Sequence, residues 1–146
     1  TVVSSSSRCL KAHARSLNAR NEMLLGSSSA GAAFANAPVG AIHALAYPLG
    51  TRLKIPHGLS ISLMIPHVLR FNAEYAREAY GKVLETAFSR KRGGEPGLTL
   101  ANEFASLSKS FNLPTRLRDF ASSSNGGEEG IKKLIPELAD EAMKQT

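Results

Sequence analysis

The amino-acid sequence predicts an all-α protein. Apolar residues recur at the three- and four-residue spacing of helix faces, and almost no segment shows the strict alternation of a half-buried strand. Proline and glycine divide the chain into segments of helical length. A chain of 146 residues is about the size of one domain, so we expect a single helical domain over residues 1–146 with about seven or eight helices.

The apolar spacing and the positions of proline and glycine together set the expected helices. Pro38 and Pro56 suit first turns, where the missing N–H of proline costs nothing. Pro48 and Gly50 should end one helix, and Pro66 should bend or restart another. The expected helices cover residues 8–17, 19–35, 38–48, 56–64, 73–89, 98–111, 115–120 and 128–144.

The expected helix over 73–89 has the clearest helical pattern in the chain. Glu78 and Lys82 form an i,i+4 pair on its polar side. The last expected helix begins with acidic residues at Glu128 and has Lys144 near its end, which is the arrangement of charge that the helix dipole favours.

The charge balance is basic, with 18 Lys and Arg residues against 12 Asp and Glu residues. Such a balance can indicate an anionic partner such as nucleic acid. The tight basic cluster, SRKRGGEPG, lies in an expected loop, and no aromatic residues interleave with it as a base-stacking surface requires. No apolar run approaches the ~18 residues that a membrane span needs. We therefore expect no nucleic-acid partner and no membrane partner.

Cys9 is the only cysteine, which excludes an internal disulfide framework and a thiolate metal cluster built from this chain. A single cysteine fits a reducing compartment, and we expect the cytoplasm. Residues 1–7 lack the apolar core of a secretory signal. Because the sequence begins with Thr1, we expect the true start to lie upstream, and targeting to an organelle by such a segment stays open.

Two of the four histidines lie where packing alone does not require a polar group. His43 stands in the apolar segment GAIHALAYPLG, and a buried imidazole requires a hydrogen bond or a metal. His57 stands in IPHG, at the start of the next expected helix. The two residues meet only if the loop TRLKI folds the second helix back on the first. Spacing alone favours a hydrogen-bonded core histidine over a shared metal.

The stretch MLLGSSSAGAAFANAPVGAIHALAYPLGTRLKIPHGLSISLMIPHVLRFN, residues 23–72, resembles the metal-binding region of the iron-containing (group III) alcohol dehydrogenases. The family's pattern is G-x-x-H, a short apolar segment ending in P-L-G, then I-P-H-G and an apolar helix. This resemblance implies that His43 and His57 are metal ligands. It also implies that the chain is the C-terminal helical bundle of a dehydroquinate synthase-like fold. His67 lies in the same stretch, but the family's pattern does not use it as a ligand.

The chain departs from the family's pattern in three respects. The family's other two ligands lie on an upstream D-x-x-x-H segment, whereas Asp119 and Asp140, the only aspartates here, lie downstream. The family's N-terminal α/β dinucleotide-binding domain is also absent, so we expect a fragment that is incomplete at its N-terminus and need not be complete at its C-terminus. Tyr47 stands where many members have a second histidine near the nicotinamide and substrate. We therefore assign Tyr47 a place in the catalytic pocket.

The resemblance implies part of an oxidoreductase that interconverts a small alcohol and its aldehyde or ketone. The metal, Fe²⁺ or Zn²⁺, acts as a Lewis acid on the oxygen, and NAD or NADP, bound mainly by the missing domain, exchanges the hydride. The implied enzyme can form a homodimer, and the fragment alone is expected to be inactive. The alternative is a truncated, catalytically inactive helical module of the same fold. A basic nucleic-acid-binding domain is the least favoured hypothesis.

Overall fold

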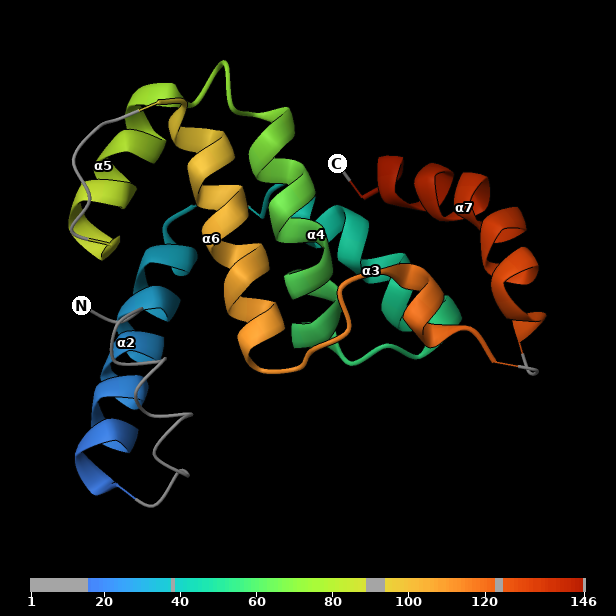
Figure 1. Ribbon diagram of the computed structural model, residues 1–146, viewed down its shortest axis with the longest axis horizontal. Coiled ribbons are helices and arrows are strands. Elements are labelled where there is room, and N and C mark those ends of the chain that lie inside the picture. The colour runs from blue at the N-terminus through green and yellow to red at the C-terminus, as the bar shows by residue number, and fades with distance from the viewer. Residues whose placement is uncertain (1–15, 38, 89–93, 123–124, 146) are drawn as a thin grey trace. The chain divides into compact units, whose positions relative to one another are not determined.

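The structure, a computed structural model, describes residues 16–37, 39–88, 94–122 and 125–145. Within these ranges it contains six α-helices, one 3-10 helix and no strand, so the all-α prediction is confirmed (Figure 1). None of the helices described is long and apolar enough to cross a membrane. The expected helix over 8–17, Cys9 and most of the basic cluster lie outside the described residues. The elements are α2 (Leu17–Ala35), α3 (Ala41–Leu53), α4 (His57–Phe71), α5 (Arg77–Phe88), α6 (Pro96–Ser110), η1 (Leu117–Phe120) and α7 (Gly127–Met143).

Tertiary contacts divide the chain into two compact units. The first unit consists of residues 1–38 and 72–100, and its described part contains α2, α5 and the beginning of α6. The second unit consists of residues 39–71 and 101–146 and contains α3, α4, the rest of α6, η1 and α7. This division does not decide between one domain and two, so the single-domain expectation stays a prediction.

Most helices end close to their expected bounds. The expected pair on the polar side of α5 is present, with 3.0 Å between Lys82 Nζ and Glu78 Oε1, and both side chains are exposed. α5 itself begins at Arg77 rather than at Ala73, because residues 72–76 form turns. The periodic apolar pattern therefore runs one turn further towards the N-terminus than the helix does.

The prediction that Pro48 and Gly50 end a helix is wrong. α3 continues through both residues to Leu53. Because proline has no N–H, the helix forfeits one backbone hydrogen bond at Pro48. The side chains of Pro48 and Leu49 are buried, and this burial compensates for the missing bond. The helix ends only at its C-cap, Lys54, whose φ of 56° is left-handed.

α4 also continues through a proline, so the expected restart at Pro66 does not occur. Pro66 and Val68 are both buried. Burial of this face again compensates for the hydrogen bond that proline, which has no N–H, cannot donate. A bend at Pro66 stays a prediction. The expected opening at Pro56 is confirmed, because the carbonyl oxygen of Pro56 accepts hydrogen bonds from the backbone N–H groups of Leu59 and Ser60, both at 2.9 Å.

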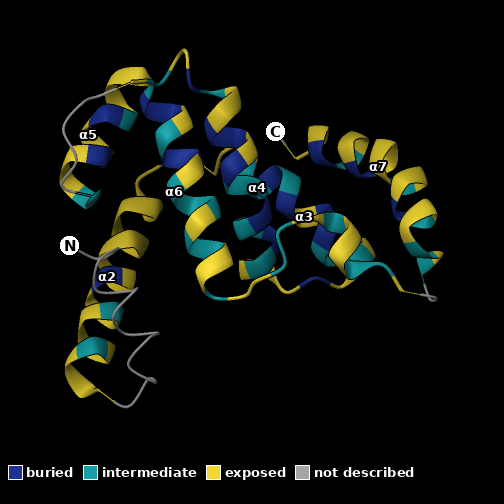
Figure 2. Cartoon of the chain, in the orientation of Figure 1, coloured by how far each residue is buried: buried dark blue, intermediate teal, exposed yellow. Residues whose placement is uncertain are grey.

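The hydrophobic core of the second unit lies where α3, α4 and α7 meet. α3 contacts both α4 and α7, and Figure 1 shows it between them. Figure 2 shows buried residues along α3 and α4, whereas α2 of the first unit is exposed along most of its length. The core cluster consists of the buried side chains of Leu49, Ile55, Leu63 and Leu138. Because α3 carries His43, this core determines where that histidine lies.

Replacing Leu63 by Ala should destabilise the chain by about 2–5 kcal/mol, because the side chain is 4% exposed and its loss leaves a cavity in the core cluster. Urea unfolding followed by circular dichroism measures the change. Leu24→Ala, at a leucine that is 72% exposed, is the matched control and should change stability by less than about 0.5 kcal/mol. Equal effects of the two substitutions would contradict the assigned core.

Candidate metal centre

The connection between α3 and α4 reverses the chain through one left-handed residue and one buried side chain. After Lys54, the N–H of Ile55 returns to the carbonyl oxygen of Leu49 at 3.3 Å, which closes the end of α3. The Ile55 side chain is only 3% exposed and belongs to the core cluster. A connection that is both hydrogen-bonded and buried holds the start of α4 in a fixed position against α3.

The first turn of α4 is held by a buried polar side chain. Ser60 is 0% exposed. Its hydroxyl donates a hydrogen bond to the carbonyl oxygen of Ile55 at 3.3 Å, and the carbonyl oxygen of Pro56 is a second acceptor at 3.4 Å. A buried hydroxyl needs such a partner, because leaving it unpaired is costly. Ser60 therefore ties the α3–α4 turn to the helix whose first residue is His57.

The fold brings His43 and His57 together. Their ring centroids lie 5.6 Å apart with an angle of 41° between the ring planes. His43 is half-buried on α3, and His57 is exposed at the first position of α4. The prediction that the chain turns back so that these two rings meet is confirmed, while their binding of a metal stays a prediction.

The separation of the two rings fits one shared divalent ion. Two imidazole nitrogens at about 2.0–2.2 Å from an ion place their ring centroids about 5 Å apart at a tetrahedral angle. The measured 5.6 Å is close to that spacing. Among residues 16–37, 39–88, 94–122 and 125–145, no group of three or more His, Cys, Asp or Glu side chains could hold a metal. The described part of the chain thus offers a pair of ligands rather than a closed site.

Tyr47 lies one helical turn after His43, on the same side of α3. The Tyr47 side chain is 56% exposed and lines a surface hollow of about 270 Å³ with the C-terminal end of α7, where Glu141 and Lys144 contribute. The hollow is not lined by His43 or His57. The predicted pocket role of Tyr47 therefore stays a prediction, but α7 is identified as the element that faces it.

An ion pair that the sequence analysis missed fixes α7 to α3 beside this hollow. Arg52 Nε donates a hydrogen bond to Glu141 Oε1 at 2.7 Å, and Glu137 Oε2 lies 3.6 Å from Arg52 Nη2. The hydrogen bond and charge of Glu141 raise the pKa of Arg52 above its usual value. The two residues are 89 positions apart in sequence, so no local pattern could have paired them.

Two other residues of the resembling stretch do not join the histidine pair. His67 is exposed on α4 and lines surface hollows with η1 and α7, so it does not lie in the core. Gly58 follows His57, and its missing side chain does not serve a close approach of another segment. A Cβ at Gly58 would meet no heavy atom within 4 Å. Within this stretch, the turn brings His43 and His57 together.

Comparison with known proteins supports the family that residues 23–72 resemble. A model of the Fe-containing alcohol dehydrogenase family, C-terminal, matches residues 1–146. Lactaldehyde reductase of Escherichia coli K12 is 31% identical over 130 residues, which cover 86% of this chain and 32% of the relative. NADPH-dependent butanol dehydrogenase of Clostridium saccharobutylicum is 30% identical, and the match covers 86% of this chain and 31% of the relative. 1,3-Propanediol dehydrogenase of Citrobacter freundii is 31% identical, and the match covers 88% of this chain and 32% of the relative. The chain spans about a third of the length of these curated relatives.

Zn²⁺ added to the purified chain should shift the ring signals of His43 and His57 together in NMR spectra, because one ion would bind both imidazoles. Binding should be weak, since a closed site needs about four ligands. His57→Ala should remove the response of His43. His67→Ala is the matched control, a histidine on the same helix, and should leave the response of the pair unchanged. Independent titration of the two rings would contradict a shared ion.

Proposed function

The chain belongs to the Fe-containing alcohol dehydrogenase family, as its C-terminal part, and from this premise we propose that it is the metal-binding half of an oxidoreductase. The complete enzyme would interconvert a small alcohol and its aldehyde or ketone with NAD or NADP. The observation that carries the proposal is the 5.6 Å separation of the His43 and His57 rings across the turn that Ser60 holds.

His43 and His57 would hold the metal through one ring nitrogen each. Neutral imidazole is a good ligand for both Fe²⁺ and Zn²⁺, and thiolate ligands are not needed. A divalent metal bound there supplies Lewis-acid polarisation of the oxygen of an alcohol or carbonyl compound. The chain's own contribution is position: the buried Ile55 and the hydroxyl of Ser60 fix the turn, and the turn fixes both imidazoles.

The remaining parts of the enzyme are proposed to lie outside these residues. Because a closed metal site needs more ligands than a histidine pair, we assign an upstream aspartate and histidine to complete it. The nicotinamide cofactor would be held mainly by an upstream α/β domain. The names of the relatives, which specify lactaldehyde, butanol and 1,3-propanediol, support a small alcohol or aldehyde as substrate. A cytoplasmic enzyme that forms a homodimer completes the proposal.

A catalytically inactive helical module is the second candidate. The observation that favours it is Tyr47, which stands where many family members have a second histidine close to the nicotinamide. A proton-transfer step that needs an imidazole at this position would then be lost. The two candidates differ in a direct way, because the inactive module would keep the histidine pair but would not support turnover in any longer version.

The 146-residue chain alone should not oxidise alcohols, because it lacks two proposed ligands and the hydride acceptor's domain. A longer version, with the upstream part of E. coli lactaldehyde reductase before residue 1, should be active with Fe²⁺ or Zn²⁺. His43→Ala or His57→Ala in that version should lower turnover and metal retention together by more than about 100-fold. NAD(P)H absorbance and metal content after dialysis measure both. Activity of the short chain, or of the His57→Ala version, would refute this assignment.

Tyr47→Phe in the longer version should change kcat or KM by about tenfold while the metal content stays the same, because the hydroxyl is proposed to face the substrate and not the metal. Steady-state kinetics with NAD(P)H absorbance give the two constants. Tyr75→Phe is the matched control, since Tyr75 is 88% exposed in the first unit. Unchanged kinetics of Tyr47→Phe would remove Tyr47 from the pocket.

A further inference from the structure

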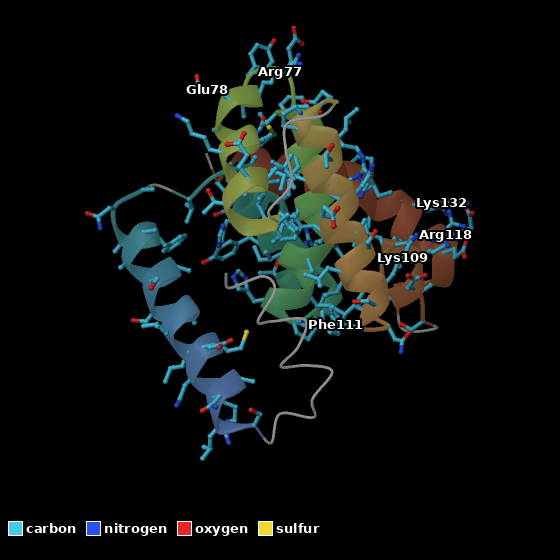
Figure 3. The ribbon with its side chains drawn as sticks, turned by 60° about the vertical axis from the view of Figure 1, so that its left-hand side comes forward. Arg77, Glu78, Lys109, Phe111, Arg118 and Lys132 are labelled. Atoms are coloured by element: carbon cyan, nitrogen blue, oxygen red, sulfur yellow. The ribbon has the colours of Figure 1, made fainter. Side chains whose placement is uncertain are left out.

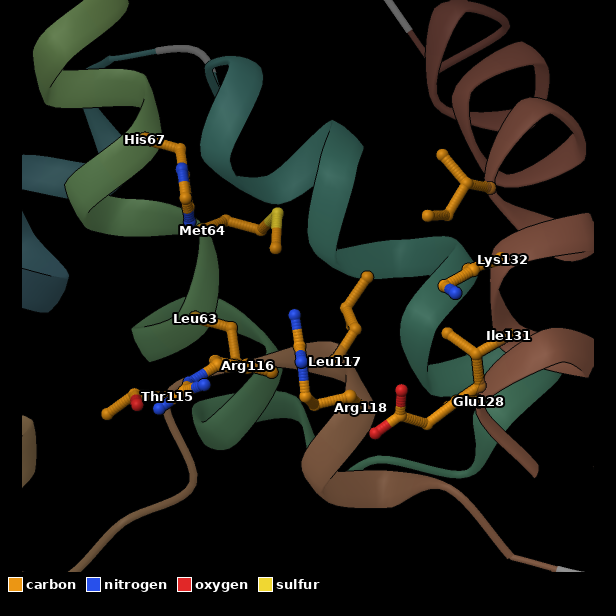
Figure 4. Close-up of a pocket in the computed structure, with 11 residues that line it drawn as sticks. Leu63, Met64, His67, Thr115, Arg116, Leu117, Arg118, Glu128, Ile131 and Lys132 are labelled. Carbon is orange, nitrogen blue, oxygen red and sulfur yellow. The ribbon is translucent and has the colours of Figure 1, made fainter.

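The second unit has a hollow of about 360 Å³ that neither His43 nor His57 lines. Its walls come from three elements: the middle of α4, the segment that leads into and includes η1, and the first half of α7 (Figure 4). The residues that form these walls are far apart in sequence, so the hollow exists only in the folded unit. No role in the proposed metal chemistry accounts for it.

Positive charge gathers at this hollow. Arg116, Arg118 and Lys132 line it, against one carboxylate, Glu128. Among the described residues, neither arginine forms an ion pair with a carboxylate, whereas Lys132 pairs with Glu129 at 2.6 Å. The two arginines, which have no carboxylate partner there, repel one another, and a bound anion relieves that repulsion.

Arg118 and Lys132 are close enough to affect one another. The hydrogen bond from Lys132 to Glu129 raises the pKa of Lys132, and the charge of Arg118 acts in the opposite direction. Figure 3 labels both side chains on the same side of the second unit, Arg118 on η1 and Lys132 on α7. An anion placed in the hollow would therefore be within reach of cations from two different elements.

A neighbouring hollow of about 200 Å³ extends the same charge pattern. It shares Leu63, His67 and Thr115 with the first hollow, and it adds two further cations, Arg70 and Lys109, and no carboxylate. Arg70 already donates a hydrogen bond to the side chain of Asn102, whereas Lys109 is exposed on α6. The two hollows together are lined by five Lys and Arg side chains and one Glu.

The first hollow also has an apolar wall. Leu63 and Ile131 are buried, and Met64 and Leu117 are half-buried beside them. Apart from the ring of His67, no aromatic side chain lines either hollow, so successive bases of a nucleic acid would find no stacking surface. A concave, basic and partly apolar surface fits a small molecule better than a nucleic-acid strand.

We propose that this hollow binds a small organic anion, with a phosphate or carboxylate group among Arg116, Arg118 and Lys132 and a compact apolar body against Leu63, Leu117 and Ile131. Guanidinium groups suit both kinds of anion, because their paired N–H groups match the oxygens of either. The site is separate from the histidine pair, so it does not depend on the proposed dehydrogenase function.

Isothermal titration of the purified chain with phenyl phosphate tests the proposal, with inorganic phosphate and benzoate as companion probes. Phenyl phosphate should bind with one-to-one stoichiometry and several-fold more tightly than inorganic phosphate, because its ring buries apolar surface. Benzoate separates the two sources of the anionic group: similar affinity favours a carboxylate ligand, and weaker affinity favours a phosphate ligand. Either result supports an organic anion site.

Arg118→Ala should weaken the binding of phenyl phosphate by about tenfold, the usual effect of losing one charge-assisted contact. Arg77→Ala is the matched control, because it removes one exposed positive charge from α5, outside the second unit. His43→Ala should bind phenyl phosphate as the original chain does, which keeps this test independent of the metal centre. Lys132→Ala provides a second variant if Arg118→Ala unfolds, as judged by circular dichroism.

Three results would overturn the proposal. One is the absence of saturable binding of phenyl phosphate at low salt. Another is an equal loss of affinity in Arg77→Ala and Arg118→Ala, which would mean attraction by net charge alone. The third is tighter binding of a short single-stranded oligonucleotide than of phenyl phosphate, with the same dependence on Arg118, which would assign the basic surface to nucleic acid.

Discussion

Burial of Ile55 and the hydrogen bond from Ser60 to its carbonyl oxygen fix the turn between α3 and α4. The side chain of Ile55 occupies the core cluster with Leu49 and Leu63, so the turn cannot move without opening the core. Because the turn is fixed, the ring centroids of His43 and His57 lie 5.6 Å apart, although the rest of α3 and the turn separate the two residues in the sequence. The candidate metal centre is therefore a consequence of core packing and needs no flexible loop to close on the ion.

α3 connects the candidate metal centre with the rest of the second unit. It carries His43 and Tyr47, contacts both α4 and α7, and forms the ion pair between Arg52 and Glu141. α7 contributes Leu138 to the core cluster and Glu141 to the hollow beside Tyr47, so a change in its position would alter both the hollow and the packing that holds the turn. The candidate pocket residue Tyr47 and the two candidate ligands are thus held by one packed scaffold of α3, α4 and α7.

Sequence reasoning succeeded where a local rule decides the structure and failed where tertiary packing does. The helical period gave most elements, and Pro56 opened α4 as expected. Pro48 did not end α3, because burial of that face outweighs one missing hydrogen bond, a balance that no local pattern contains. The meeting of His43 and His57 was available only from the family resemblance, since spacing alone favoured a core histidine. No local sequence pattern indicated that Arg52 pairs with Glu141 on α7, because the two residues are 89 positions apart.

Two locally unfavourable features, Pro48 and Lys54, lie between the two histidines in the sequence, while Asn112, with a φ of 53°, and Pro136 inside α7 lie elsewhere in the second unit. Pro48 removes a helix donor and Lys54 adopts a left-handed φ of 56°, each of which costs of order 1 kcal/mol or more. Ser60 is a polar group in the core that stays stable only through its bond to the turn. A helical hairpin selected for stability alone would have glycine at the left-handed position and no buried hydroxyl. Packing of the turn offsets the costs at Lys54 and Ser60, and the same turn brings the two imidazoles together.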